Sequence, residues 1–185
     1  MIEDVYEECP VYKKKLITLR KIKKEDAQEL LKCYSDERSV PFFNSDNCDG
    51  DDFHYTTVER MNQAIDFWES SYSNRQFVRW TVILNSTSEK IGSVEMFHRT
   101  ASDEFNDYGV LRIDLKSEYE TKPVIESILA VSNEFFYSAF DVKSILTKGF
   151  KDSKERICAF KNMGYEPINK KFMIYDDYYC RKAER

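Results

Sequence analysis

The chain has 185 residues and a formal net charge of −5, which is enough length for one domain with a substantial buried core. The acidic balance disfavours nucleic acid as the main partner, because neutralising phosphates requires a concentrated basic face. No run of residues approaches the length of a membrane span, and the polar N-terminal stretch lacks the apolar core of a signal peptide, so we expect a cytoplasmic protein.

The five cysteines are scattered, odd in number and without a C-x-x-C pair, which disfavours a disulfide framework or a zinc cluster. We therefore expect reduced thiols. No internal repeat, low-complexity tract or Pro/Gly-rich linker divides the sequence, so residues 1–185 are predicted to form a single domain.

The N-terminal half predicts a strand, two helices and a hairpin. Residues 15–22 alternate apolar and polar side chains, as in a strand, and residues 24–34 place apolar side chains on one helical face after an acidic first turn. Residues 57–72 carry apolar and aromatic side chains at the spacing of an amphipathic helix. Residues 76–84 and 90–99 are β-rich runs joined by a polar turn, which predicts an antiparallel hairpin.

Residues 35–55, called the acidic loop below, are polar and rich in aspartate. A calcium-binding loop needs ligands at fixed positions around a central glycine, and with Gly50 in that place the first ligand falls on Ser45 and the last on Thr56. That register fails, so we expect no metal site. We expect instead a mobile loop that samples a cationic substrate.

The segment formed by residues 108–164 predicts a strand, a long amphipathic helix, a second strand and a second helix that ends at Gly164. A helical crossover between two strands of one sheet is right-handed and leaves the strands parallel. A ligand of this unit would lie at the carboxyl end of the first strand, against the first turn of the helix, around residues 115–125. Residues 171–182 predict a last pair of strands.

Three stretches carry a family resemblance: LITLRKIKKEDAQELLKCYSD, FVRWTVILNSTSEKIGSVEMFHR and LTKGFKDSKERICAFKNMGYEP. Together with the order of elements, they resemble the GNAT superfamily of acetyl-CoA-dependent N-acetyltransferases, and most closely the branch that acetylates ribosomal-protein N-termini. The resemblance implies an α/β (α+β) fold. Its mixed, mostly antiparallel central sheet would have about six or seven strands, helices on both faces and a parallel strand-helix-strand unit at the centre.

The resemblance also implies a site for acetyl-CoA as co-substrate. In the family, the central strand splays from its neighbour and its backbone pairs with the pantetheine arm, which the backbone of residues 113–115 would do in this chain. A turn of pattern R/Q-x-x-G-x-G/A presents amide groups to the pyrophosphate. The residues implied to line the cofactor are Leu115, Tyr119, Thr121, Lys122, Val124, Ile125 and Ser153.

The chain departs from the family pattern at this site. Thr121 and Pro123 fill both glycine slots of the turn, and proline has no amide hydrogen to donate. Ser153 and Arg156 stand where the family has Asn and Ser, and Phe160 stands where many members have a tyrosine general acid. The alternative interpretation is therefore a catalytically silent binding or interaction module that keeps the fold and has lost acetyl-CoA.

Transfer of acetyl to a primary amine, on a peptide N-terminus or a small molecule, needs a base that deprotonates the amine. Glu95 and Asp114 are the candidate catalytic residues, because both lie in central strands that would border the splay. The alternative for each is a structural carboxylate that faces solvent or pairs with Arg99 or Arg112. The sequence does not distinguish a monomer from a homodimer.

Overall fold

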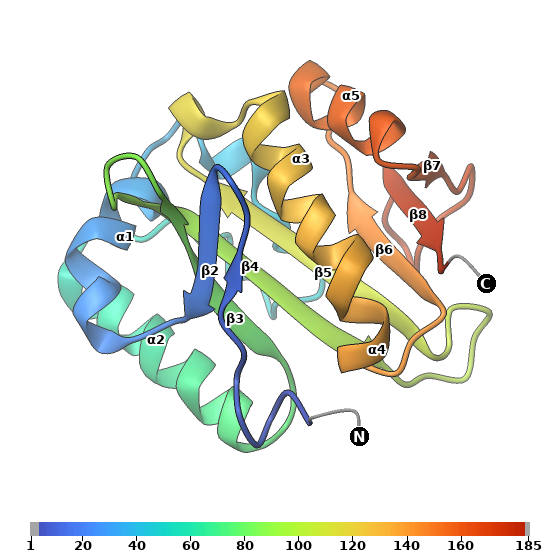
Figure 1. The fold of residues 1–185 in the computed structure, drawn as a ribbon, viewed down its shortest axis with the longest axis horizontal. Coiled ribbons are helices and arrows are strands. Elements are labelled where there is room, and N and C mark those ends of the chain that lie inside the picture. Colours follow the sequence, from blue (N-terminus) through green and yellow to red (C-terminus); the bar gives the residue numbers. More distant parts are fainter. Residues whose placement is uncertain (1–3, 184–185) are drawn as a thin grey trace.

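The computed structural model describes residues 4–183, whose eight strands form one mixed sheet in the order β1-β2-β3-β4-β5-β6-β8-β7 (Figure 1). The strands are β1 (Tyr12–Lys13), β2 (Ile17–Lys21), β3 (Val78–Leu84), β4 (Lys90–Arg99), β5 (Tyr108–Leu115), β6 (Ser144–Lys148), β7 (Glu166–Pro167) and β8 (Tyr178–Lys182). The helices are α1 (Ala27–Tyr34), α2 (Val58–Ser73), α3 (Lys122–Val131), α4 (Tyr137–Ala139) and α5 (Lys154–Asn162), with a π-helical turn at Ser132–Phe136 and short 3₁₀ turns at Lys24–Asp26, Val40–Phe42 and Ser117–Tyr119. No helix among the described residues combines the length and apolar character that crossing a membrane requires.

The predicted fold class is confirmed, and the strand count exceeds the expected six or seven because β1 and β7 are additional two-residue strands. The predicted pair of strands in residues 171–182 is wrong in part. Only β8 is a strand, and it pairs with β7 instead of with a neighbour in that run. Met173 and Asp177 adopt positive φ values of 58° and 66°, which turn the chain sharply before β8 and leave Phe172 and Tyr175 as an isolated bridge.

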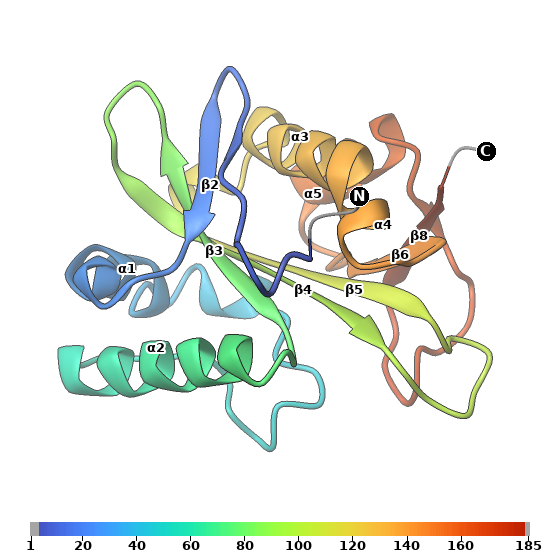
Figure 2. The same cartoon turned by 60° about the horizontal axis from the view of Figure 1, so that its bottom comes forward.

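Helices cover both faces of the sheet, with α1 and α2 on one side and α3 and α5 on the other (Figure 2). Side chains alternate between these faces along each strand. On β3, Val78, Trp80 and Val82 belong to the apolar core that also contains the buried face of α3. Arg79 and Thr81 therefore point to the opposite face, towards the layer of α1 and α2, and both are buried there.

The strands β5 and β6 form the parallel pair that the sequence predicts, but their pairing is short. It joins Gly109, Val110 and Leu111 to residues 145–147, whereas β5 continues to Leu115. The two strands therefore fork beyond Leu111, and the start of α3 lies beyond the carboxyl end of β5 (Figure 1). The predicted splay is thus present.

Gly92 allows the hairpin to approach β5 closely. It lies beside the β-bulge at which the pairing of β3 and β4 shifts between Val82 and Ile83. A Cβ atom on residue 92 would lie 2.0 Å from the backbone carbonyl oxygen of Asp114. The close approach is between two backbones, so no side-chain rotation could relieve the clash.

We expect Gly92→Ala to lower the free energy of unfolding by about 3 kcal/mol, because β4 and β5 must separate to admit the methyl group. Gly50→Ala is the control, since no atom lies within 4 Å of a Cβ there and only the strain of its φ of +84° remains, about 1 kcal/mol. Urea denaturation of both variants measures the difference. An equal loss of unfolding free energy in the two variants would contradict the close approach of β4 to β5.

Candidate functional site

Three buried ionisable side chains, Arg79, Glu95 and Asp114, meet the partly buried Arg112 on the α1/α2 face of the sheet. Cross-strand pairing places Arg79 of β3 opposite Glu95 of β4, and Glu95 opposite Arg112 of β5, so their side chains share this face. Arg79 Nη2 lies 2.5 Å from Glu95 Oε2, and Arg112 Nη1 lies 2.8 Å from Glu95 Oε1. Arg79 Nη1 lies 3.0 Å from Asp114 Oδ2, which also accepts a hydrogen bond from the Tyr34 hydroxyl at 2.9 Å.

This network decides the charge state of the two predicted catalytic carboxylates. Burial alone would raise the pKa of Glu95, but the guanidinium groups of Arg79 and Arg112 hold it below its ordinary value. Burial raises the pKa of Asp114, and Arg79 and Tyr34 oppose the rise only in part. The side chains of Glu95 and Asp114 are 2% and 1% exposed, so the geometry favours the structural alternative for both. Their catalytic role stays a prediction.

Arg79 was missed as a site residue in the sequence. The signal was a lone arginine inside the apolar run that became β3. A charged residue on a buried strand face is stable only beside an opposite charge, so it points to carboxylates on the neighbouring strands. The side chain of Trp68 on α2 completes its surroundings, with the guanidinium carbon 4.1 Å from the ring centroid.

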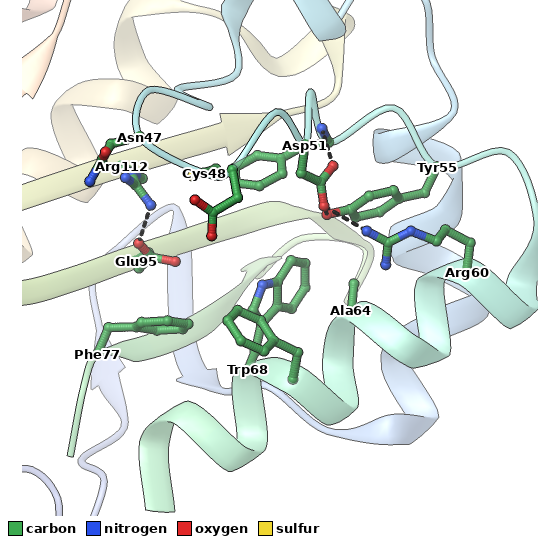
Figure 3. Close-up of a pocket in the computed structure, with 13 residues that line it drawn as sticks. Asn47, Cys48, Asp51, Tyr55, Arg60, Ala64, Trp68, Phe77, Glu95 and Arg112 are labelled. Carbon is green, nitrogen blue, oxygen red and sulfur yellow. Dashed lines mark hydrogen bonds and ion pairs between the residues drawn. The ribbon is translucent and has the colours of Figure 1, made fainter. Parts of the chain in front are cut away.

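A pocket of about 430 Å³ opens beside this network, between α2 and the acidic loop. Figure 3 shows Trp68 and Ala64 reaching in from α2, with the Glu95–Arg112 pair on one side and the Asp51, Tyr55 and Arg60 cluster on the other. Its lining consists of Asn47, Cys48, Asp49, Asp51, Phe53, Tyr55, Arg60, Ala64, Phe67, Trp68, Phe77, Glu95 and Arg112.

Within the described part of the chain, no three His, Cys, Asp or Glu side chains are grouped to hold a metal ion.

The acidic loop, expected to be mobile, is tethered at several points. Asp46 accepts hydrogen bonds from Lys148 Nζ at 2.6 Å and from the Tyr178 hydroxyl at 3.0 Å, and its carbonyl accepts one from Arg112 Nη2 at 2.8 Å. Farther along, Asp51 Oδ2 accepts hydrogen bonds from Arg60 at 2.6 Å and from the Tyr55 hydroxyl at 2.9 Å. These contacts hold the loop over the pocket in this structure.

The residues implied to line the cofactor gather around the start of α3, on the other side of the sheet from the pocket. Leu115 ends β5, Thr121 is the N-cap of α3, and Lys122, Val124 and Ile125 form its first turn. The Tyr119 hydroxyl donates to Glu89 Oε2 at 2.6 Å. Ser153 is the N-cap of α5, and its hydroxyl donates to Glu120 Oε1 at 3.0 Å.

The chain's own side chains occupy the fork between β5 and β6. Arg156 is 1% exposed, and its Nη2 donates to the backbone carbonyl of Ile113 at 3.0 Å, the strand segment expected to pair with pantetheine. Its Nε and Nη2 also contact the two carboxylate oxygens of Glu120 at 2.6 and 2.8 Å. At the start of α3, the amide of Lys122 donates to Glu155 Oε2 at 2.8 Å. In this arrangement the residues present do not fit acetyl-CoA.

Replacing Arg79 should be severely destabilising, because it leaves Glu95 and Asp114 buried together without a shared counter-charge. We expect Arg79→Met to lower the free energy of unfolding by about 3 to 5 kcal/mol in urea denaturation. Arg75→Met, which removes an exposed pair with Asp4, is the matched control and should cost under about 1 kcal/mol. A similar cost for both variants would show that the network contributes little.

The lowered pKa of Glu95 predicts a pH-dependent contribution to stability. This contribution is present above the ordinary value of 4.5 and is lost as pH falls through the lower folded-state pKa. The gap in unfolding free energy between wild type and Glu95→Gln should therefore narrow from about pH 6 to about pH 3 in urea titrations. Glu59→Gln, at an exposed position, should differ from wild type by a small unfolding free energy that does not change with pH. A difference for Glu95→Gln that widens as pH falls would refute the lowered pKa of Glu95.

Comparisons with known proteins agree with this fold. Residues 17–166 match the family model described as "Acetyltransferase (GNAT) domain". A search of curated proteins found no match. The solved ribosomal-protein-S5-alanine acetyltransferase from Vibrio fischeri has a TM-score of 0.72 and 15% identity, covering 95% of this chain and 97% of its own.

Two further similar structures were solved with coenzyme A. Mycobacterium smegmatis RimJ in complex with CoA-disulfide has a TM-score of 0.71 and 11% identity, over 90% of this chain and 82% of its own. RimL, a ribosomal L7/L12 alpha-N-protein acetyltransferase in complex with coenzyme A, has a TM-score of 0.67 and 10% identity, over 94% and 98%. At these identities the structures establish the fold alone, whereas the family model spans most of the sequence. This chain therefore belongs to the GNAT acetyltransferase family.

Proposed function

We propose that this domain binds a ligand carrying a positively charged amine, in the pocket between α2 and the acidic loop. The observation that carries the proposal is Asp49, which lines the pocket and whose carboxylate makes no hydrogen bond or ion pair with any described residue. An unpaired carboxylate at an otherwise neutralised site attracts a cation.

The other charges of the pocket are already paired. Asp51 is bound by Arg60 at 2.6 Å, and Glu95 is bound by both Arg79 and Arg112. Asp49 is therefore the surplus charge of the lining. One ammonium group would neutralise it without leaving a second charge unsatisfied, whereas a carboxylate ligand would be repelled.

The walls of the pocket suit the same ligand. Phe53, Trp68 and Phe77 contribute aromatic surface, and aromatic faces attract cations while also contacting an alkyl chain. The volume of about 430 Å³ is within the range of small-molecule sites and also admits the first residues of a peptide. The names of the V. fischeri protein and of RimL describe acetylation of an alanine and of a protein alpha-amine, which supports an amine as the ligand class.

Acetyl transfer to the bound amine is the activity predicted from the sequence, and it requires the amine in its unprotonated form. Of the two predicted bases, Glu95 lines the pocket, but its lowered pKa and its two arginine partners make it a weak proton acceptor. The pocket therefore suits binding of the protonated amine better than removal of its proton. Binding is thus the function that the geometry supports best.

We expect Asp49→Asn to weaken the binding of a tri-alanine peptide with a free N-terminus about fivefold, the loss of roughly 1 kcal/mol from one partly exposed ion pair. Isothermal titration calorimetry measures the change. The same peptide with an acetylated N-terminus should bind weakly and equally to wild type and variant.

Glu59→Gln is the matched control, because it removes one carboxylate from α2 outside the pocket lining. It should leave peptide affinity unchanged. Equal binding of the free and acetylated peptides to wild type would refute the amine as the recognised group, and unchanged affinity in Asp49→Asn would refute the assigned carboxylate.

A further inference from the structure

Three features meet at the fork beyond Leu111: the edge of β5 that is not paired with β6, the start of α3 and the start of α5. A diphosphate group binds at a helix N-terminus through free backbone amides, and an extended ligand pairs with a free strand edge. Part of each set of backbone groups is already engaged within this chain. Glu155 accepts from the Lys122 amide and Arg156 donates to the Ile113 carbonyl, while the Glu120 carboxylate holds Arg156 in place.

Residues 120–123 at the start of α3 offer no free backbone amide to an anion. The N–H groups of Glu120 and Thr121 donate to carbonyls in the preceding turn, at 3.3 and 2.7 Å. The N–H of Lys122 donates to the Glu155 carboxylate at 2.8 Å, and Pro123 has no N–H. Glu155 therefore supplies, from the chain itself, the anion that a helix N-terminus attracts.

Arg156 closes the strand side of the fork. Its guanidinium donates to the carbonyl of Ile113 on β5, and its central carbon lies 5.2 Å from the ring centroid of Phe150, which follows β6. One side chain thus spans both arms of the fork. Glu120 neutralises it through two contacts of 2.6 and 2.8 Å, and the Glu120 side chain is only 7% exposed.

A neutralised, two-point Arg–Glu pair at this depth costs much to open. Moving Arg156 out would leave the Glu120 carboxylate buried beside α3, where an anionic ligand would repel it. Moving Glu120 out would leave Arg156 without its counter-charge. An incoming diphosphate would also meet the Glu155 carboxylate at the Lys122 amide.

We infer that Glu120, Glu155 and Arg156 are built-in substitutes for acetyl-CoA, so that this domain does not take the cofactor of its family and acts as a binding module. The loss of the cofactor stands independently of the amine ligand proposed above, because the two sites lie on opposite faces of the sheet, whereas the role as a binding module rests on that ligand. The pocket is left open, while the fork is filled.

The test is calorimetric titration of the full chain with acetyl-CoA and with coenzyme A. Wild type should show no binding at about 1 mM ligand. The double variant Glu120→Gln with Arg156→Ser removes both charges and most of the side-chain volume in the fork, and its affinity should rise at least about tenfold. The control pair Glu104→Gln with Lys170→Ser removes an exposed ion pair and should leave wild-type behaviour unchanged.

Micromolar binding of acetyl-CoA by wild type would overturn the inference, and this arm needs no variant. A double variant that melts cooperatively yet still binds no coenzyme A would overturn it as well, because Glu120 and Arg156 would then not be what excludes the ligand.

Glu155→Gln provides a second variant that leaves the core untouched, since Glu155 is exposed. It should bind inorganic pyrophosphate about tenfold more tightly than wild type, through the freed Lys122 amide and the removal of one carboxylate. Unchanged pyrophosphate affinity would overturn the role assigned to Glu155. Peptide binding in the pocket, measured on the same samples, reports separately on the amine site.

Discussion

The guanidinium of Arg79 is the contact on which the centre of this molecule depends. Its Nε and Nη2 bind Glu95 of β4, and its Nη1 contacts Asp114 of β5 and the hydroxyl of Tyr34 on α1. One side chain therefore connects three strands and a helix across a buried layer. Two carboxylates at this depth could not both remain ionised without it, because burial of unpaired charge costs several kcal/mol per ion.

A second buried arginine has a corresponding role on the opposite face. Arg156 is as deeply buried as Arg79, and it also connects strand backbone with a carboxylate. The two sites meet at β5, where Asp114 contributes its side chain to the first network and Ile113 its carbonyl to the second. Acetyl transfer would require a free base and a free cofactor cleft. In this chain Arg79 binds both candidate bases, and Arg156 binds the strand carbonyl in the cofactor cleft.

Hydrophobic periodicity was sufficient to predict most of the fold. The apolar face of the helix after β5 and the alternation in β2 report directly on burial, so their positions follow from local pattern. The fork was predictable only through the family resemblance, because strand separation leaves no periodic signal. One of the two C-terminal strands was misplaced, since the chain turns sharply at Met173, a residue type with no turn preference, and β8 pairs with the distant β6 and β7.

The candidate site was less predictable than the fold because its chemistry depends on contacts between distant residues. Glu95 and Asp114 were recognisable as unusual carboxylates in apolar strands, but their partner Arg79 and the consequence for their pKa values required the strand register. Arg156 was visible as a departure from the family pattern. That its guanidinium would reach Ile113 follows only from the packing of α5 against the fork.

The tether at Asp46 has a consequence for how the molecule acquires its pocket. Asp46 is bound by the Tyr178 hydroxyl, a residue 132 positions later, and Tyr178 begins the last strand. During synthesis this one tether of the acidic loop can therefore form only after almost all of the chain has left the ribosome, later than the contacts with Arg60, Arg112 and Lys148. Contacts between such distant residues form late in folding. The acidic loop thus reaches its full set of contacts over the pocket only when β8 has joined the sheet.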